Sequence, residues 1–179
     1  LRAEHGGHGC VTLDETCNDA MTGSLPHFTE EDIQQINAIF ADFLRKAEAD
    51  LVLLTAEGGF LVTQFGNADR LDTMTLGALS SNSFEANKAI AGLIGEPTFS
   101  STYQAGANFS VYVQSIDGYN LMVVIFPVKT GVGAIRYYAQ TARDELTRVF
   151  DRARQRSPGE GLDLALMNAT ESTHIFKRQ

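Results

Sequence analysis

Between residues 28 and 156, apolar side chains recur with two spacings, one typical of helices and the other of strands. Steps of three and four residues place an apolar stripe along one side of a helix. Such steps predict helices over residues 29 to about 47, over residues 71–95, and from just after Gly133 to about Arg156. Five shorter apolar or β-branched segments predict strands at residues 51–54, 60–65, 98–103, 109–116 and 119–128. A single sheet with helices on both faces would bury all of these stripes.

The boundaries of these elements carry their own signals. Thr29 and Asp72 precede the first two helices as N-caps, and Pro97 follows the end of the second. The sequence Ala-Glu-Gly-Gly at residues 56–59 and the dipeptide Asp117-Gly118 are typical hairpin turns. The first two strands and the last two strands are therefore predicted to pair as antiparallel hairpins.

The helix over residues 71–95 has two different faces. We expect its mainly apolar stripe to lie on the sheet; this stripe comprises Leu76, Leu79, Ser83, Ala86, Ile90 and Leu93. The opposite face is small or polar and comprises Gly77, Ala78, Ser81, Asn82, Glu85, Lys88, Ala89 and Gly92. Such a face lets a second backbone come close and suggests a docking surface. Small residues are also ordinary filler in helices, and the sequence leaves both interpretations open.

The two ends of the chain show neither period. Residues 1–27 are predicted to be a disordered or weakly ordered tail, and residues 157–179 form a second tail after the domain at residues 28–156. The second tail contains Ile175 and Phe176, and it is either disordered or folds as a short segment against a partner. In the first tail, the possible metal ligands are His5, His8, Cys10 and Cys17. Their spacing matches no paired-ligand signature, so no metal site is expected.

Composition excludes several classes of function. The net charge is -8 and the isoelectric point is near 4.9, which argues against a nucleic-acid partner because phosphate binding requires clustered cations. Four arginines end the last predicted helix, and we interpret them as a solvated helix terminus rather than a phosphate site; they are Arg148, Arg152, Arg154 and Arg156. No apolar run approaches the roughly 20 residues that span a bilayer. The N-terminus lacks the apolar core of a signal peptide, so a cytoplasmic protein without membrane insertion is expected.

No catalytic motif is present. A phosphate-binding loop is missing, because Val128 stands before Lys129-Thr130 where a glycine would be needed. There is no Gly-x-Ser-x-Gly elbow, and the four histidines lie at residues 5, 8, 27 and 174, near the two ends. The sequence therefore predicts no catalytic residue and no cofactor of its own.

Several segments resemble the roadblock family of dynein light chains and bacterial GTPase regulators, especially its gliding-motility regulators. The resemblance covers roughly residues 28 to 156 and rests on the order of elements and on four stretches: LLTAEGGFLVTQFG, the small-residue helix ending in LIGE, FSVYVQSIDGYNLMVVIF and ARDELTRVF. The implied fold is an α+β, three-layer α-β-α domain. Its five-stranded antiparallel sheet would carry one long helix on one face and two helices on the other.

The resemblance also implies an assembly and a partner. Family members of this type form symmetric homodimers in which the middle helices pair and the third strands meet edge to edge. By position, the implied dimer contacts are Gly77, Ala78, Thr98, Ser100 and Thr102. The exposed side of the paired helices would bind one Ras-like small GTPase. It would accelerate GTP hydrolysis by repositioning the GTPase's own switch residues. The implied cellular processes are cell polarity and motility. The implied contacts with this partner are Ser81, Asn82, Glu85, Lys88 and Ala89.

Two points remain open at this level. Glu85 departs from the small residue usual at its position, and it would repel an acidic patch on the partner. A non-catalytic scaffold or adaptor of a GTPase or motor complex is the alternative function. A ligand-sensing domain is a third possible function, and it would require a closed polar pocket.

Overall fold

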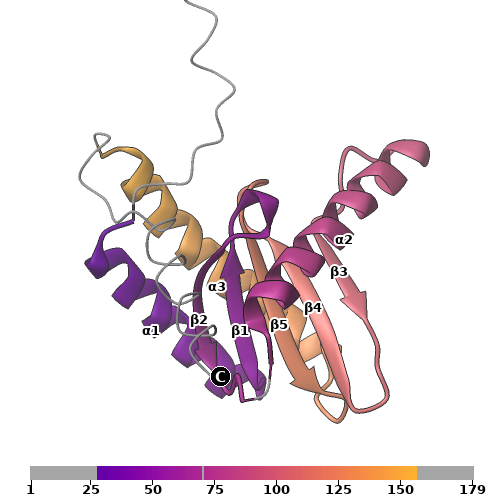
Figure 1. The fold of residues 1–179 in the computed structure, drawn as a ribbon, viewed down its shortest axis with the longest axis horizontal. Coiled ribbons are helices and arrows are strands. Elements are labelled where there is room, and N and C mark those ends of the chain that lie inside the picture. The colour runs from indigo at the N-terminus through magenta and orange to yellow at the C-terminus, as the bar shows by residue number, and fades with distance from the viewer. Residues whose placement is uncertain (1–27, 70, 157–179) are drawn as a thin grey trace, which may run out of the picture.

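The computed structural model describes residues 28–69 and 71–156 (Figure 1). The predicted tails at residues 1–27 and 157–179 lie outside this range, and so do both cysteines and all four histidines. The described elements are α1 (Glu30–Ala47), β1 (Leu51–Thr55), the short 3₁₀ helix η2 (Glu57–Gly59), β2 (Leu61–Gly66), α2 (Thr73–Leu93), β3 (Ser101–Gln104), β4 (Phe109–Ser115), β5 (Leu121–Pro127) and α3 (Val132–Arg154). The predicted order of elements is confirmed.

One antiparallel sheet, in the order β2-β1-β5-β4-β3, forms the middle layer. Helices α1 and α3 cover one face and α2 crosses the other, as Figure 1 shows. The larger core lies under α1 and α3 around Phe40, Val124 and Phe150. The smaller core lies under α2 around Phe84 and Val123. The expected three-layer arrangement, with one long helix on one face and two on the other, is therefore confirmed.

Local capping explains where the helices begin. The Thr29 hydroxyl accepts a hydrogen bond from the Asp32 amide, and the Asp32 carboxylate accepts one from the Thr29 amide at 2.8 Å. This reciprocal pair is a capping box. The Asp72 carboxylate likewise accepts from the Thr75 amide at 3.0 Å, so α2 begins at the predicted cap.

Both predicted hairpins are present. Strands β1 and β2 are joined through η2, and β4 and β5 are joined by a turn at Asp117-Gly118. In that turn the Asp117 carboxylate accepts from the amides of Tyr119 and Asn120 at 3.1 and 2.8 Å. Strand β3 is shorter than predicted, because only residues 101–104 pair with β4, and it forms one free edge of the sheet.

The arginines that end α3 are not simply a solvated terminus, so this interpretation is wrong in part. Arg154 forms an ion pair with Asp117, and Arg156 forms one with the buried Asp32 of α1. Only Arg148 and Arg152 are exposed without an acidic partner among those described, and Arg152 donates to the Gln35 side chain and the Arg148 carbonyl. Two of the four arginines therefore fasten the end of α3 to the rest of the domain.

Candidate protein-interaction surface

Helix α2 contacts the sheet through its small side chains and one phenylalanine. Phe84 is 2% exposed and reaches into the smaller core. The other buried positions of α2 are Thr73, Gly77, Ser80, Ser81 and Ala91. These residues repeat with helical spacing, so they form one face, but it is not the face that the apolar pattern predicts.

The β1–β2 connection explains why small residues are needed on this face. A Cβ added at Gly59 would lie 2.5 Å from the Ala78 Cα, and one added at Gly77 would lie 2.8 Å from the Thr55 Cγ2. Gly59 also has φ +83°, a conformation that side chains disfavour. Of the predicted dimer contacts on this helix, Gly77 is buried within its own chain and Ala78 is half-buried beside η2, and their roles in a dimer stay predictions.

The predicted sheet-facing stripe of α2 is largely exposed, so that expectation is wrong. Leu79 is 62% exposed, Leu93 is 87% exposed, and Ile90 is about half exposed. Ile94, just after the helix, is 65% exposed. Leu76 is the exception, because it packs against the smaller core. We call the exposed side chains Leu79, Ile90, Leu93 and Ile94 the apolar stripe.

The apolar stripe lies on the side of α2 that is turned toward the free sheet edge. Ser83, which shares this side of the helix with Leu79 and Ile90, accepts a hydrogen bond from the Gln104 side chain of β3 at 3.2 Å. Tyr103, the neighbour of Gln104 in β3, is half exposed at the same edge, but its ring stacks on Phe126 on the opposite face of the sheet. An apolar helix flank and an unpaired strand edge therefore form one continuous surface.

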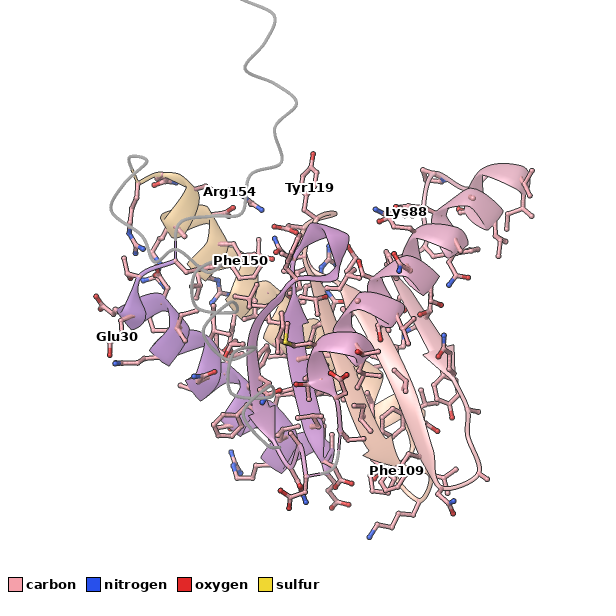
Figure 2. All side chains as sticks on the ribbon, in the orientation of Figure 1. Glu30, Lys88, Phe109, Tyr119, Phe150 and Arg154 are labelled. Atoms are coloured by element: carbon pink, nitrogen blue, oxygen red, sulfur yellow. The ribbon has the colours of Figure 1, made fainter. Side chains whose placement is uncertain are left out.

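The outward flank of α2 carries the predicted partner contacts. Asn82, Glu85 and Ala89 are exposed. Lys88 is half-buried; its ammonium lies 2.6 Å from the Glu85 carboxylate and 3.5 Å from the Gly118 carbonyl (Figure 2). Ser81 is only 4% exposed and faces the sheet, so it offers little surface to a partner. The binding roles of all five residues stay predictions.

The three predicted contacts near β3 occupy the edge of the molecule. Thr98 and Ser100 are exposed and precede the strand, and Thr102 is half-buried within it. The Ser100 carbonyl accepts from the Ser115 amide and the Gln114 side chain at 3.0 Å each. The dimer roles predicted for these three residues also stay predictions.

A mainly apolar groove opens beside the N-terminal end of α2. Its volume is about 360 Å³, and its lining comprises Asp50, Leu51, Asn67, Asp69, Leu71, Leu76, Phe109, Val111 and Ile125. Leu71 and Phe109 are about half exposed at its mouth, while Ile125 forms part of its base. It opens to solvent and is not the closed polar pocket that a ligand-sensing domain would need.

Two kinds of feature are absent from the described residues. Across residues 28–69 and 71–156 there is no group of three acidic, histidine or cysteine side chains placed to hold a metal ion. No helix in that range is long and apolar enough to cross a bilayer.

Comparison with known proteins gives a consistent group of relatives. No family model matches the sequence, and no curated protein matches it. Among solved structures, MglB of Myxococcus xanthus is similar, with 31% identity and a TM-score of 0.68 over 73% of this chain and 97% of that one. An MglB structure described as having a tetrameric arrangement has 22% identity and a TM-score of 0.66, over 73% of this chain and 97% of that chain. A roadblock/LC7 domain from Streptomyces avermitilis shares the fold at 10% identity and a TM-score of 0.57, over 63% of this chain and 94% of its own.

Proposed function

The chain belongs to the roadblock family and groups with its MglB proteins, and on this basis we propose that it is a homodimeric regulator of a Ras-like small GTPase of the MglA type. The observation that carries the proposal is the two-sided exposure of α2. One flank is apolar and adjoins a free strand edge, whereas the other is polar, small and turned to solvent. The first flank suits a second copy of the chain, and the second suits a different protein.

Self-association is supported by the cost of leaving the apolar stripe in water. Burying one leucine or isoleucine side chain contributes about 1.5–3 kcal/mol, and the stripe carries four exposed ones. A two-fold axis beside β3 would bury two stripes and pair two strand edges at once. One MglB structure is described as having a tetrameric arrangement, which supports self-association in this group of proteins.

The GTPase would dock on the outward flank formed by Asn82, Glu85, Lys88 and Ala89. Glu85 and Lys88 pair with each other, so the two charges of this flank largely cancel. Lys88 is the one cation among these four residues, but it is half-buried and held by the Glu85 carboxylate and the Gly118 carbonyl, so it is not placed to enter another protein's active site and stabilise a transferring phosphoryl group. We therefore propose that the chain accelerates hydrolysis by holding the GTPase's own switch residues in a reactive arrangement, as a cytoplasmic regulator of polarity and motility.

Because the one cation of the outward flank is already paired, this flank also suits the alternative role, in which the dimer is a scaffold or adaptor. A scaffold would bind the GTPase without changing its turnover. The regulator and the scaffold therefore differ in one measurable quantity, the rate of GTP hydrolysis by the bound partner.

The proposal is tested by measuring mass and turnover together. One subunit of 179 residues has a mass of 19.5 kDa, and we expect light scattering to give twice this mass. We expect phosphate release from a cognate small GTPase to rise at least tenfold when the dimer is added, with no release from the dimer alone. Binding without acceleration would establish the scaffold, and a monomer that binds none of the organism's small GTPases would refute both roles.

A further inference from the structure

Two apolar features at opposite ends of α2 lack a described partner. At its N-terminal end is the groove lined by Leu71, Leu76 and Phe109, with an open mouth. At its C-terminal end are Leu93 and Ile94, the most exposed large apolar side chains of the helix. The groove and this exposed end have matching chemistry, because each exposes mainly hydrocarbon.

The two features cannot meet within one chain. Helix α2 has 21 residues, so its ends lie roughly 30 Å apart at 1.5 Å per residue. Figure 1 shows the C-terminal end of α2 extending past β3, beyond the edge of the sheet. Figure 2 places Phe109 at the opposite end of the molecule from this part of the helix, where Lys88 is labelled. Any contact between them requires a second copy.

Symmetry determines where that second copy would place its helix. If two β3 edges pair about a two-fold axis perpendicular to the sheet, the strands run antiparallel and both α2 helices stay on the same face. The helices then also run antiparallel, so the C-terminal end of each approaches the N-terminal end of the other. The part of α2 that extends past β3 is the part that would overlie the neighbouring sheet.

We propose that Leu93 and Ile94 of each subunit occupy the groove of the other subunit. The proposal rests on the homodimer proposed above and specifies how its helices are aligned. The contact occurs twice per dimer, because each chain supplies one groove and one apolar end. One symmetric arrangement would bury both the groove and the apolar end of α2. The contact would also extend the apolar stripe, which begins at Leu79 beside β3.

The chain offers one competing occupant, which the experiment must distinguish. Residues 175–178 read Ile-Phe-Lys-Arg, and two carboxylates, Asp50 and Asp69, lie at the groove. A segment with an apolar pair and two cations could satisfy both parts of the groove. We favour the second copy, because this segment would leave Leu93 and Ile94 exposed.

Disulfide trapping in the full chain tests the contact. The background carries Cys10→Ser and Cys17→Ser, which removes both native thiols. Two double variants are then oxidised: Leu71→Cys with Leu93→Cys, and Leu76→Cys with Leu93→Cys. A disulfide needs Cα atoms about 4.4–6.8 Å apart, so neither pair can close within one straight helix, and any such bond must join two chains.

We expect at least one double variant to give mainly covalent dimer on a non-reducing gel, while each single variant stays mainly monomeric. The single variants are the matched controls, because the two copies of any one helix end would lie far apart. Self-linking by Leu93→Cys alone would overturn the proposal, since it would place the two C-terminal ends together. Cross-linking that appears only after Phe176→Asp is added would assign the groove to residues 175–178 and would also overturn it.

A second measurement separates this contact from dimerisation itself. Leu93→Asp places a carboxylate next to Asp50 and Asp69, and we expect the dimer dissociation constant to rise about a hundredfold, roughly tenfold for each leucine lost. Tyr137→Asp on α3 is the control, because Tyr137 is exposed on the far face of the sheet, and it should leave the constant unchanged. A dimer that dissociates equally in wild type and Leu93→Asp would overturn the contact alone. A wild-type monomer would overturn the homodimer and the contact together.

Discussion

Arg156 donates hydrogen bonds to both carboxylate oxygens of Asp32, and the bond from its Nη2 to Oδ1 measures 2.9 Å. This pair joins Arg156, two residues after the end of α3, to the first turn of α1, across 124 positions of sequence. Asp32 is 1% exposed and also accepts from the amide and hydroxyl of Thr29. One carboxylate therefore caps α1 and fastens the far end of the domain.

The pair predicts a specific dependence of stability on pH. Burial raises the pKa of Asp32, but the bonds from Arg156 and Thr29 outweigh it and lower the pKa from near 3.8 to about 2. A lowered pKa stabilises the fold at pH values above about 4, and this contribution is lost as the pH falls toward 2. We expect Asp32→Asn to lower the free energy of unfolding by about 2 kcal/mol at pH 7. Urea titrations followed by circular dichroism should show this difference shrinking to near zero at pH 2, and a difference that is constant with pH would contradict the assignment.

The close approach of η2 to α2 predicts an unequal response of two glycines. Gly59 and Gly118 both have positive φ, but an added Cβ would meet the Ala78 backbone at Gly59 and nothing within 4 Å at Gly118. Gly118→Ala should cost about 1 kcal/mol of stability from backbone strain alone. Gly59→Ala should cost about 3 kcal/mol, because the overlap with α2 is added. Thermal unfolding of the two variants makes the comparison, and equal losses would show that α2 can move away without cost.

Thr55 offers a stabilising substitution. Its side chain is fully buried at the end of β1, and its hydroxyl has no hydrogen-bond partner among the described residues. Valine has the same shape without the polar atom, so Thr55→Val should raise the free energy of unfolding by about 1 kcal/mol. Chemical denaturation measures the change. Thr55→Ser keeps the hydroxyl but loses the methyl group beside Gly77, and it should destabilise instead.

Two neighbouring positions on α2 should separate partner binding from self-association. Ala89 lies on the outward flank, and Ile90 lies in the apolar stripe about 100° around the helix. Ala89→Arg should reduce stimulation of the GTPase at least tenfold and leave the dimer mass unchanged. Ile90→Arg should produce monomers, because a cation then replaces a contact between the two copies.

Light scattering and phosphate release, measured on both variants, give four numbers. Unchanged stimulation by Ala89→Arg would move the partner to another surface. Melting temperatures near that of the wild type would show that both side chains lie outside the core, as their exposure indicates.

The elements could be predicted where the signal is local. Thr29 and Asp72 mark the helix starts through their own hydrogen bonds with residues three positions away, and Asp117-Gly118 marks its turn in the same way. The ion pair between Arg156 and Asp32 could not be predicted, because nothing in either segment specifies the other. Only the folded arrangement of α1 beside α3 brings the two charges together.

The orientation of α2 shows a second limit of the sequence. Its periodicity identifies an apolar face and a small face, but both faces can be buried, one against the sheet and one against another protein. Gly77 faces the sheet where η2 comes close, Phe84 reaches into the smaller core on the same face, and Leu79 and Leu93 are left outside. The apolar pattern alone therefore does not say which face of the helix lies on the sheet.

The ring of Phe28 lies 5.2 Å from that of Phe150, and the Arg156 side chain donates a hydrogen bond to the Thr29 hydroxyl. The first and last described residues of the domain therefore lie at the same corner. This corner belongs to the α1 and α3 layer, on the far side of the sheet from α2 (Figure 1). A fluorescent protein or affinity tag that is fused before residue 28 or after residue 156 would therefore join the domain away from both flanks of α2. Labelled versions of the chain suit imaging in living cells and surface immobilisation alike.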